Sequence, residues 1–241
     1  MDYILNIHQL HKSYGSLNAV TDLNIQLKKG QVFGLLGPNG AGKSTTIECI
    51  LGTKIPDNGD ISILDMHPRK DRKELFEHVG VQFQEAKYQH MIQVLELCEA
   101  TASLYKDPED ISTLLQKFAL ADKTTTYVKD LSGGERQRLF IILALIPKPQ
   151  LVFLDELTTG LDPRARRDVW NILVQLKKEG LSILLTSHFM DEVELLCDQI
   201  CILKKGQTVF YGTVQEAIAK SPYTAFEDAY LWFTDEGGQN L

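Results

Sequence analysis

The sequence predicts an α/β fold in which helices flank a mainly parallel sheet, with an N-terminal antiparallel β subdomain and an inserted all-helical subdomain. Three observations indicate this fold class. Short apolar runs recur along the chain, helix-forming stretches separate them, and apolar and polar side chains alternate within residues 1–30. Strands that alternate with helices are typical of a parallel sheet with helices on both faces.

The expected elements can be placed in order along the chain. Alternation over residues 23–27, followed by a Lys-Lys-Gly turn, predicts antiparallel strands within residues 1–30. The apolar run VFGLL at 32–36 indicates a buried strand, and a helix-forming stretch follows over residues 43 to about 51. The chain after Gly212 is expected to be helical. Further buried strands are expected at residues 151–154, 182–185 and 199–203.

Residues 86–146 interrupt this alternation, because they hold helical patterns and no convincing strand. The helical patterns cover residues 91–105, 108–120 and 133–146. Asp107 and Pro108 suit the cap and the first position of the second helix. We therefore expect a single domain whose core comprises residues 1–85 and 147–241, with a helical insertion at 86–146.

Composition and charge exclude several classes of protein. The 25 Lys and Arg residues face 32 Asp and Glu residues without any prominent basic run, which argues against a nucleic-acid partner. No apolar stretch approaches the roughly 20 residues that cross a bilayer, and the N-terminal residues lack the pattern of a secretory signal. None of the four cysteines lies in a CxxC pair, so we expect buried, reduced thiols rather than a zinc or redox site.

The strongest motif is a glycine-rich loop between the strand at 32–36 and the helix that follows it. Residues 37–44 read GPNGAGKS and fit the pattern G-x-x-x-x-G-K-[ST]. The glycines let backbone N–H groups crowd around an anion, and the helix presents its positive end to phosphates. We expect Lys43 to reach the β- and γ-phosphates of a nucleotide and the Ser44 hydroxyl to ligate Mg²⁺. The predicted fold is therefore of the P-loop NTPase type.

Two carboxylates follow the apolar strand at 151–154, at the edge of the sheet where ligands of α/β proteins bind. Asp155 is placed to hold Mg²⁺ directly or through water. Glu156 should point the other way from the strand end, where its carboxylate can accept a proton from an attacking water. The loop alone leaves kinases, GTPases and ATPases open, and these carboxylates favour hydrolysis.

Residues 131–138, which read LSGGERQR, narrow the class further. Ser132 and Glu135 have the spacing of a capping box before an apolar helix. The box leaves Gly133 and Gly134 unexplained, since each glycine costs about 1 kcal/mol relative to alanine inside a helix. Glycines at this point suit the close approach of another group, such as a phosphate held by a second subunit.

With these motifs in this order, the sequence resembles the ATP-binding-cassette (ABC) family over nearly its whole length. The resemblance is closest to ATPase subunits of the ABC-2-type drug, polysaccharide and sodium efflux group. It implies that the nucleotide is bound by Tyr14, Gly37, Asn39, Gly40, Gly42, Lys43, Ser44, Thr45, Ser132, Gly133, Gly134 and Asp162. It implies catalytic roles for Glu156, His188, Gln84 and Lys43, and contacts with Mg²⁺ for Ser44, Gln84 and Asp155.

The resemblance also gives individual roles to residues that would be unremarkable alone. Tyr14 corresponds to the aromatic that stacks on adenine, and Gln84 to the glutamine that senses Mg²⁺ and the attacking water. Ser132–Gly134 correspond to the signature that contacts the γ-phosphate of ATP held mainly by the partner subunit. Asp162 corresponds to a residue of the loop that links the two nucleotide sites of a dimer. His188 corresponds to the histidine of the family that is called the switch histidine.

As a whole, the resemblance implies an ATPase that uses ATP and Mg²⁺ and works as a head-to-tail dimer of identical or related subunits. Its partner would be an integral-membrane permease, which places the chain on the cytoplasmic face of the cell membrane and suggests export. The chain departs from the family at Glu135, where glutamine is common, and at Leu157, where proline is usual.

Two other roles stay open at this point. One is a soluble ATPase of the same family that serves an assembly process, such as an iron–sulfur scaffold. The other is a role on nucleic acid, in DNA repair, chromosome structure or translation. Such proteins carry long coiled coils, zinc insertions or a second cassette, and the sequence has none of these patterns.

Overall fold

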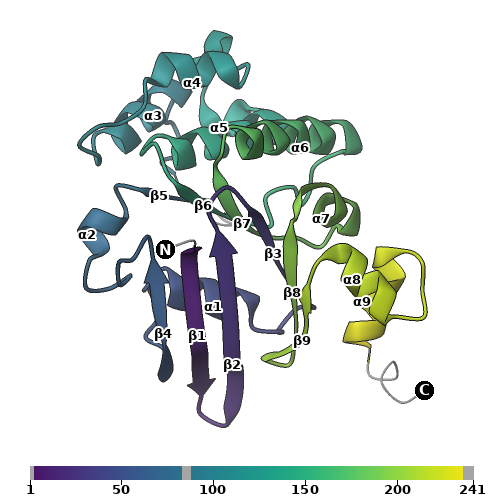
Figure 1. Cartoon of the computed structure of the whole chain (residues 1–241). Helices are drawn as coiled ribbons and strands as arrows, with labels where there is room; N and C mark the ends of the chain where they lie inside the picture. Colours follow the sequence, from purple (N-terminus) through teal and green to yellow (C-terminus); the bar gives the residue numbers. More distant parts are fainter. Residues whose placement is uncertain (1–2, 83–87, 236–241) are drawn as a thin grey trace.

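The computed structural model describes residues 3–82 and 88–235 and contains two sheets with helices packed against them (Figure 1). An antiparallel sheet has the strand order β2-β1-β4. Its strands are β1 (Tyr3–Tyr14), β2 (Leu17–Lys28) and β4 (Asn58–Ile63). Leu23, Ile25 and Leu27 are each at most 1 % exposed. The alternating pattern thus marks the buried face of β2, and the antiparallel strands expected within residues 1–30 are confirmed.

The larger sheet has the order β5-β6-β7-β3-β8-β9, and β9 is antiparallel to its neighbour. The strands are β3 (Val32–Leu36), β5 (Val79–Gln82), β6 (Leu151–Asp155), β7 (Ser182–Thr186), β8 (Gln199–Lys204) and β9 (Gln207–Gly212). The four buried strands expected from the sequence correspond to β3, β6, β7 and β8. The sequence pattern does not predict β4, β5 or β9. Strand β5 has only 4 residues, while β4 and β9 contain glycine and polar residues, so their apolar signal is weak.

Different structures cover the two faces of the larger sheet. The helices of the core are α1 (Lys43–Ile50), α6 (Pro163–Lys178), α7 (Met190–Leu196), α8 (Val214–Lys220) and α9 (Phe226–Thr234). On one face, Val152 and Leu154 pack with α6 and the helical insertion. On the other face, Leu35 and Phe153 pack with α1 and the three-stranded sheet. Helices lie on both faces as expected, but on the second face the three-stranded sheet shares the surface with α1.

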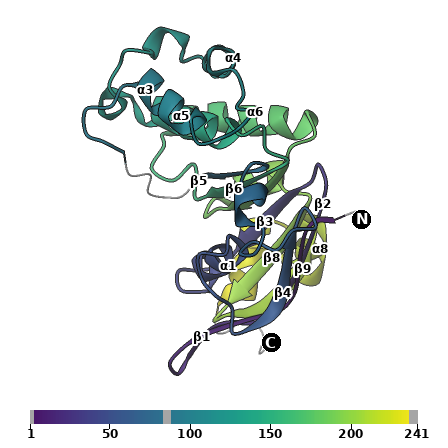
Figure 2. The same cartoon turned by 90° about the vertical axis from the view of Figure 1, so that its left-hand side faces the viewer.

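The described part of the segment between β5 and β6, residues 88–150, is mainly helical and lies at the end of the molecule away from the three-stranded sheet (Figures 1 and 2). Its helices are α3 (Val94–Ala102), α4 (Ile111–Lys117) and α5 (Gly133–Leu145), and the short α2 (Arg72–Leu75) precedes β5. The expected start of α4 at Asp107 and Pro108 is wrong. Asp110 caps α4 by accepting from the Thr113 backbone N–H at 2.7 Å, while Asp107 forms an ion pair with Lys148.

Among the described residues, no helix is both long enough and apolar enough to cross a bilayer. The longest, α6, carries a polar face with several arginines and lysines. Its buried residues, Val169, Trp170, Leu173 and Leu176, recur at helical spacing and face the sheet. This helix is therefore amphipathic and packs against the core.

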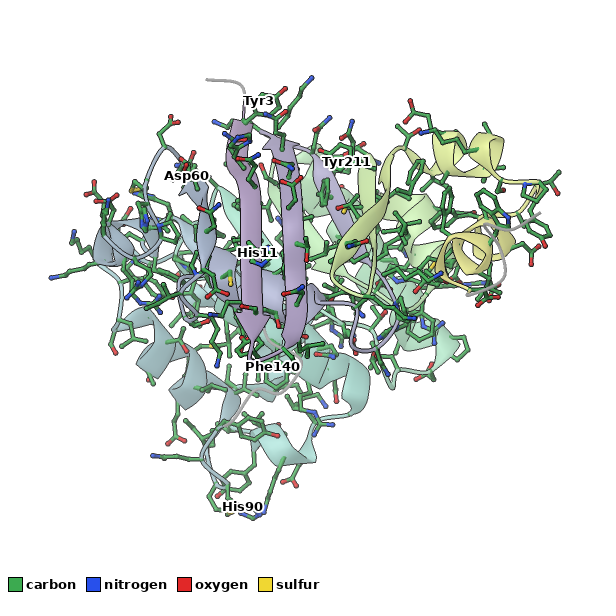
Figure 3. The ribbon with its side chains drawn as sticks, turned by 90° about the horizontal axis from the view of Figure 1, so that it is seen from below. Tyr3, His11, Asp60, His90, Phe140 and Tyr211 are labelled. Carbon is green, nitrogen blue, oxygen red and sulfur yellow. The ribbon has the colours of Figure 1, made fainter. Side chains whose placement is uncertain are left out.

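Two close approaches fix the relative positions of these elements. The Tyr211 hydroxyl of β9 donates to the Gln26 carbonyl at 3.1 Å and accepts from the Gln26 N–H at 3.3 Å, which joins the two sheets (Figure 3). At Gly80 of β5, an added Cβ would overlap the carbonyl oxygen of Ala144 in α5. Helix α5 can thus pack directly on β5 only because residue 80 has no side chain.

Candidate functional site

A pocket of about 720 Å³ opens where the β3–α1 loop faces the ends of β6 and β7. We call it the loop pocket. It is lined by Tyr14, Leu17, Asn18, Ala19, Asn39, Gly40, Ala41, Gly42, Lys43, Ser44, Thr45, Glu156, His188 and Lys205. Residues predicted from four separate motifs of the sequence therefore meet in one cavity.

The loop itself depends on glycine at Gly42, the cap of α1. Its φ of 106° lies in the left-handed region, and a Cβ there would press against the Ala19 carbonyl oxygen of β2. The close packing of the loop on β2 places Ala19 and Asn18 in the pocket wall. The backbone N–H groups at the start of α1 face the same cavity, which makes it suited to an anion.

Lys43 lies almost entirely inside this loop, at 6 % exposure. Its ammonium donates to the Gly37 carbonyl at 2.7 Å and to the Pro38 carbonyl at 3.3 Å. Burial lowers the pKa of Lys43, and the charges of Glu156 and Asp155 oppose that shift. The site thus holds a cation between the loop carbonyls and the two carboxylates.

The register of the sheet sets the positions of the two carboxylates. Asp155 pairs with Thr186 on the neighbouring strand, and the Thr186 hydroxyl donates to the Asp155 carboxylate at 2.5 Å. The same hydroxyl accepts from the Glu156 backbone N–H at 3.0 Å. The Thr186 side chain therefore bonds both Asp155, the last residue of β6, and Glu156, the residue that follows it.

Glu156 has a φ of 49°, in the left-handed region that costs a non-glycine residue about 1–3 kcal/mol. This bend turns its carboxylate away from Asp155 and toward His188, and Glu156 Oε1 lies 2.6 Å from His188 Nε2. The Glu156 side chain is only 13 % exposed, against 35 % for His188. The pair forms a partly desolvated acid–base couple at the edge of the loop pocket.

A second cavity of about 410 Å³, which we call the signature pocket, contains the predicted residues of the Ser-Gly-Gly segment together with Asp162. It is lined by Ser132, Gly133, Gly134, Arg138, Gly160, Leu161, Asp162, Arg164, Ala165 and Asp168. The capping box is present: the Ser132 N–H donates to Glu135 Oε2 at 2.8 Å, and the Ser132 hydroxyl accepts from the Glu135 N–H at 3.3 Å. Among residues 3–82 and 88–235, none lines both this pocket and the loop pocket.

The packing of α5 on α6 corrects one inference about the glycines. A Cβ on Gly134 would lie 3.0 Å from the Ala165 Cβ, so helix packing alone favours glycine at this position. Gly133 has more room, since a Cβ there would meet only the Leu161 side chain, at 3.3 Å. Of these two glycines, Gly134 is thus explained by helix packing and Gly133 is not. Asp162 caps α6, where its carboxylate accepts from the Arg164 and Ala165 backbone N–H groups.

Two of the predicted residues that the structure describes, Gly37 and Asp155, line neither pocket. Gln84 falls outside the described residues. Gly37 contributes its carbonyl to Lys43, and Asp155 lies behind the pocket wall on Thr186. Sequence reasoning missed Leu17, Asn18, Ala19, Lys205 and Thr186. Thr186 had a signal, because it precedes His188 by two residues at the end of a predicted strand, whereas the other four carry no motif.

The capping box yields a stability prediction. Hydrogen bonds from the backbone and the hydroxyl of Ser132, assisted by Lys123, lower the pKa of Glu135 to about 2. Unfolded glutamate titrates at about 4.3, so this stabilisation is complete above that pH and fades as the pH falls toward 2. We expect Glu135→Ala to lower the free energy of unfolding by about 1 kcal/mol at neutral pH, and by less near pH 3.

Urea unfolding at both pH values measures this difference. Glu135→Gln is the matched control, because glutamine also completes a capping box and should lose less stability than alanine. An equal loss for Glu135→Ala at neutral and at acidic pH would contradict the charged capping box.

The chain matches known proteins in both sequence and structure. Residues 20–159 match the family model for ABC transporters. The Nod factor export ATP-binding protein I of Cupriavidus pinatubonensis is 36 % identical over 220 residues, which cover 89 % of this chain and 68 % of that protein. The protein of the same name from Rhizobium etli is 37 % identical over 219 residues, covering 89 % and 69 %.

Comparison with solved structures leads to the same family as comparison of sequences. The ATP-binding subunit of an ABC transporter has a TM-score of 0.87 at 26 % identity and covers 96 % of this chain and 100 % of its own. cbiO1 from Clostridium perfringens, part of the ABC transporter complex cbiONQ, has a TM-score of 0.82 at 30 % identity and covers 91 % and 92 %. Together with the loop pocket, these matches settle the class of the protein. The chain belongs to the ABC transporter family, as an ATP-binding subunit that hydrolyses ATP to drive transport.

Proposed function

We propose that this chain powers export through a separate integral-membrane permease, from the cytoplasmic face of the cell membrane, as one half of a head-to-tail ATPase dimer. One observation supports the dimer: the phosphate loop lines one pocket and the Ser-Gly-Gly segment lines another, and no residue that the structure describes lines both. A site that uses both needs the loop pocket of one subunit and the signature pocket of the next.

In the loop pocket, Tyr14 would stack on adenine, since its ring is 42 % exposed at the rim. The loop from Gly37 to Thr45 would surround the phosphates, with Lys43 exchanging its carbonyl partners for phosphate oxygens. The Ser44 hydroxyl and the Asp155 carboxylate are oxygen ligands of the kind Mg²⁺ prefers.

The residues present fit a nucleotide-bound Mg²⁺. In the described part of the chain, no cluster of three or more His, Cys, Asp or Glu side chains could hold a metal without other ligands. Mg²⁺ at phosphate sites usually takes one or two carboxylates and completes its shell with phosphates and water. Ser44 and Asp155 suit this mode, with Gln84 as the third contact implied by the family, and the metal would neutralise charge on the phosphates.

For hydrolysis, we assign Glu156 as the base that accepts the proton of the attacking water. Its contact with His188 supports this role, because the histidine holds the carboxylate beside the phosphate loop. His188 would also contact the γ-phosphate. Lys43 would stabilise the charge that develops on the transferred phosphoryl group.

The partner subunit would complete the site with the residues of its signature pocket. The N–H groups at the start of α5, from Ser132 to Gly134, would approach the γ-phosphate, and Asp162 would lie between the two sites. ATP would therefore draw two identical or related subunits together, and hydrolysis would release them. The difference in dimer affinity between the ATP-bound state and the state after hydrolysis is what can move a membrane partner.

Export is supported by the relatives, which are named for Nod factor export. The relatives and structures described above are all transport proteins, which does not favour an iron–sulfur scaffold or a nucleic-acid role. The transported substrate would be selected by the permease, so it is not specified by the ATPase chain.

Affinity isolation of the tagged chain from detergent-solubilised membranes tests the proposal. We expect one polytopic membrane protein in stoichiometric amount, and we expect ATP hydrolysis by the complex to respond to reconstitution into vesicles. Tagged chain added after solubilisation controls for non-specific adsorption. Recovery of the chain with soluble proteins only, or stimulation of its ATPase activity by DNA or ribosomes, would contradict the permease partner.

A further inference from the structure

A buried carboxylate lies behind the loop pocket, on a helix that the mechanism above does not use. Glu192 is in the first turn of α7 and is 3 % exposed. It lines neither the loop pocket nor the signature pocket. Burial raises the pKa of Glu192, and hydrogen bonds from its neighbours oppose the shift.

Two side-chain donors from different segments bond this carboxylate, and a third polar side chain affects its pKa. The Thr158 hydroxyl, from the β6–α6 loop, donates to Glu192 Oε1 at 3.0 Å. The indole N–H of Trp170, from α6, donates to the same oxygen at 2.8 Å. The Ser187 side chain, from the segment after β7, also opposes the rise in the pKa of Glu192. The carboxylate therefore joins the β6–α6 loop and α6 to α7, the helix that follows His188.

The two loops are the ones that carry the proposed catalytic pair. Thr158 follows Glu156 by two residues, and Ser187 directly precedes His188. Thr158 and Ser187 are 1 % and 2 % exposed, so both are buried with Glu192. Because Glu192 follows His188 by four residues, any shift of the Glu156 loop relative to this segment must break or bend the Thr158 bond.

A second contact, from a residue one turn earlier on α6, joins the same two loops. The Arg166 guanidinium lies 3.6 Å from the centre of the Phe189 ring, and its side chain also reaches the Leu161 carbonyl, at 3.5 Å. Phe189 follows His188, and Leu161 precedes Asp162. Arginine over an aromatic face is a favourable contact that strengthens when it is desolvated.

A purely stabilising role explains Glu192 poorly. Removing a carboxylate from water is costly, and apolar residues of similar volume are often as good for stability as a buried polar or ionic group. A fully bonded polar group instead fixes one arrangement of the segments that it joins. The contacts of Glu192 therefore give a geometric rather than an energetic reason for a carboxylate at this position.

We propose that Glu192 is a positioning residue for ATP hydrolysis: it holds the loop from Glu156 to Asp162 in register with His188. The proposal rests on the function assigned above to Glu156 and His188. Through its bond to Thr158, Glu192 keeps the loop of the base beside the histidine, which lies four residues before Glu192. Because Asp162 ends the same loop, the carboxylate also ties the loop pocket to the edge of the signature pocket.

Two single-donor variants of the full chain form a matched test. Thr158→Val and Trp170→Phe each leave Glu192 one donor short, but only Thr158 belongs to the loop. We expect Thr158→Val to lower kcat for ATP hydrolysis by about 10-fold or more, with KM for ATP changed less than about 3-fold, since small misplacements of reacting groups act on kcat. Trp170→Phe should lower the melting temperature at least as much and lower kcat much less.

Substitutions of the carboxylate itself give an independent readout. Glu192→Leu removes the acceptor, whereas Glu192→Gln keeps an oxygen that can accept from both Thr158 and Trp170. We expect Glu192→Gln to retain most of the kcat that Glu192→Leu loses. We also expect Thr158→Val to have little further effect on kcat in a Glu192→Leu background.

The outcomes separate this proposal from the function on which it rests. If Thr158→Val and Trp170→Phe lower kcat equally, in proportion to their loss of stability, Glu192 is merely structural and the proposal is overturned. A fully active Thr158→Val beside an active unmodified protein overturns it as well, and leaves the role of Glu156 intact. Normal hydrolysis by Glu156→Gln would instead overturn the catalytic assignment itself.

Discussion

Glu156→Gln is expected to lower kcat for ATP hydrolysis by about 10²–10⁴-fold, the range that a positioned general base contributes. Glutamine has nearly the same shape, so the hydrogen bond to His188 and the bend at residue 156 can persist. The amide cannot accept the proton of the attacking water. ATP affinity should stay close to that of the unmodified protein, and a dimer should accumulate with ATP because release needs hydrolysis.

Phosphate release, equilibrium binding of ATP and light scattering in the presence of ATP and Mg²⁺ measure these three effects. Glu194→Gln is the matched control, since Glu194 is an exposed residue of α7 that lines neither pocket. It should behave like the unmodified protein in all three assays. Turnover by Glu156→Gln at the unmodified rate would rule out the residue as the base.

Gly80→Ala is expected to have the largest effect on stability, a loss of about 3 kcal/mol, at the upper end of the cost of overpacking. The added Cβ would overlap the Ala144 carbonyl oxygen, which is backbone and cannot rotate away. Helix α5 must then move off β5, and with it the signature pocket. For a domain of this size the loss corresponds to a fall of about 6–12 °C in the melting temperature.

Calorimetry or circular dichroism measures this change. Gly133→Ala is the control, because a Cβ at that position meets only the flexible Leu161 side chain, at 3.3 Å. It should change the free energy of unfolding by less than about 1 kcal/mol. Equal melting temperatures for Gly80→Ala and the unmodified protein would show that α5 does not need this close approach.

Much of the loop pocket could be predicted from the sequence because most of its functional residues lie in short contiguous motifs. The loop around Lys43 needs glycines where the chain bends and approaches β2, and these occur in one short motif. Asp155 and Glu156 end a strand whose apolar run is unambiguous. In these two segments, the local backbone conformation and the binding site require the same residues. A short sequence motif therefore predicts both the conformation and the site.

Other features depend on partners that are distant in the sequence. The start of α4 was misplaced because Asp107 and Asp110 are both good caps, and Asp107 is engaged by Lys148 instead. The packing reason for Gly134 lies in Ala165 of another helix. Leu17 lines the loop pocket as an exposed apolar residue, and nothing in a single sequence separates it from other surface leucines.

At Glu156, the left-handed backbone conformation favours glycine, whereas the proposed reaction requires a carboxylate. Glycine adopts a φ of 49° without the steric conflict that a Cβ brings, so the residue that would relax this bend is one with no carboxylate. A laboratory selection for heat resistance alone would favour glycine at this position and yield a more robust but inactive ATPase. The proposed catalytic role of Glu156, rather than the stability of the bend, therefore accounts for glutamate at this position.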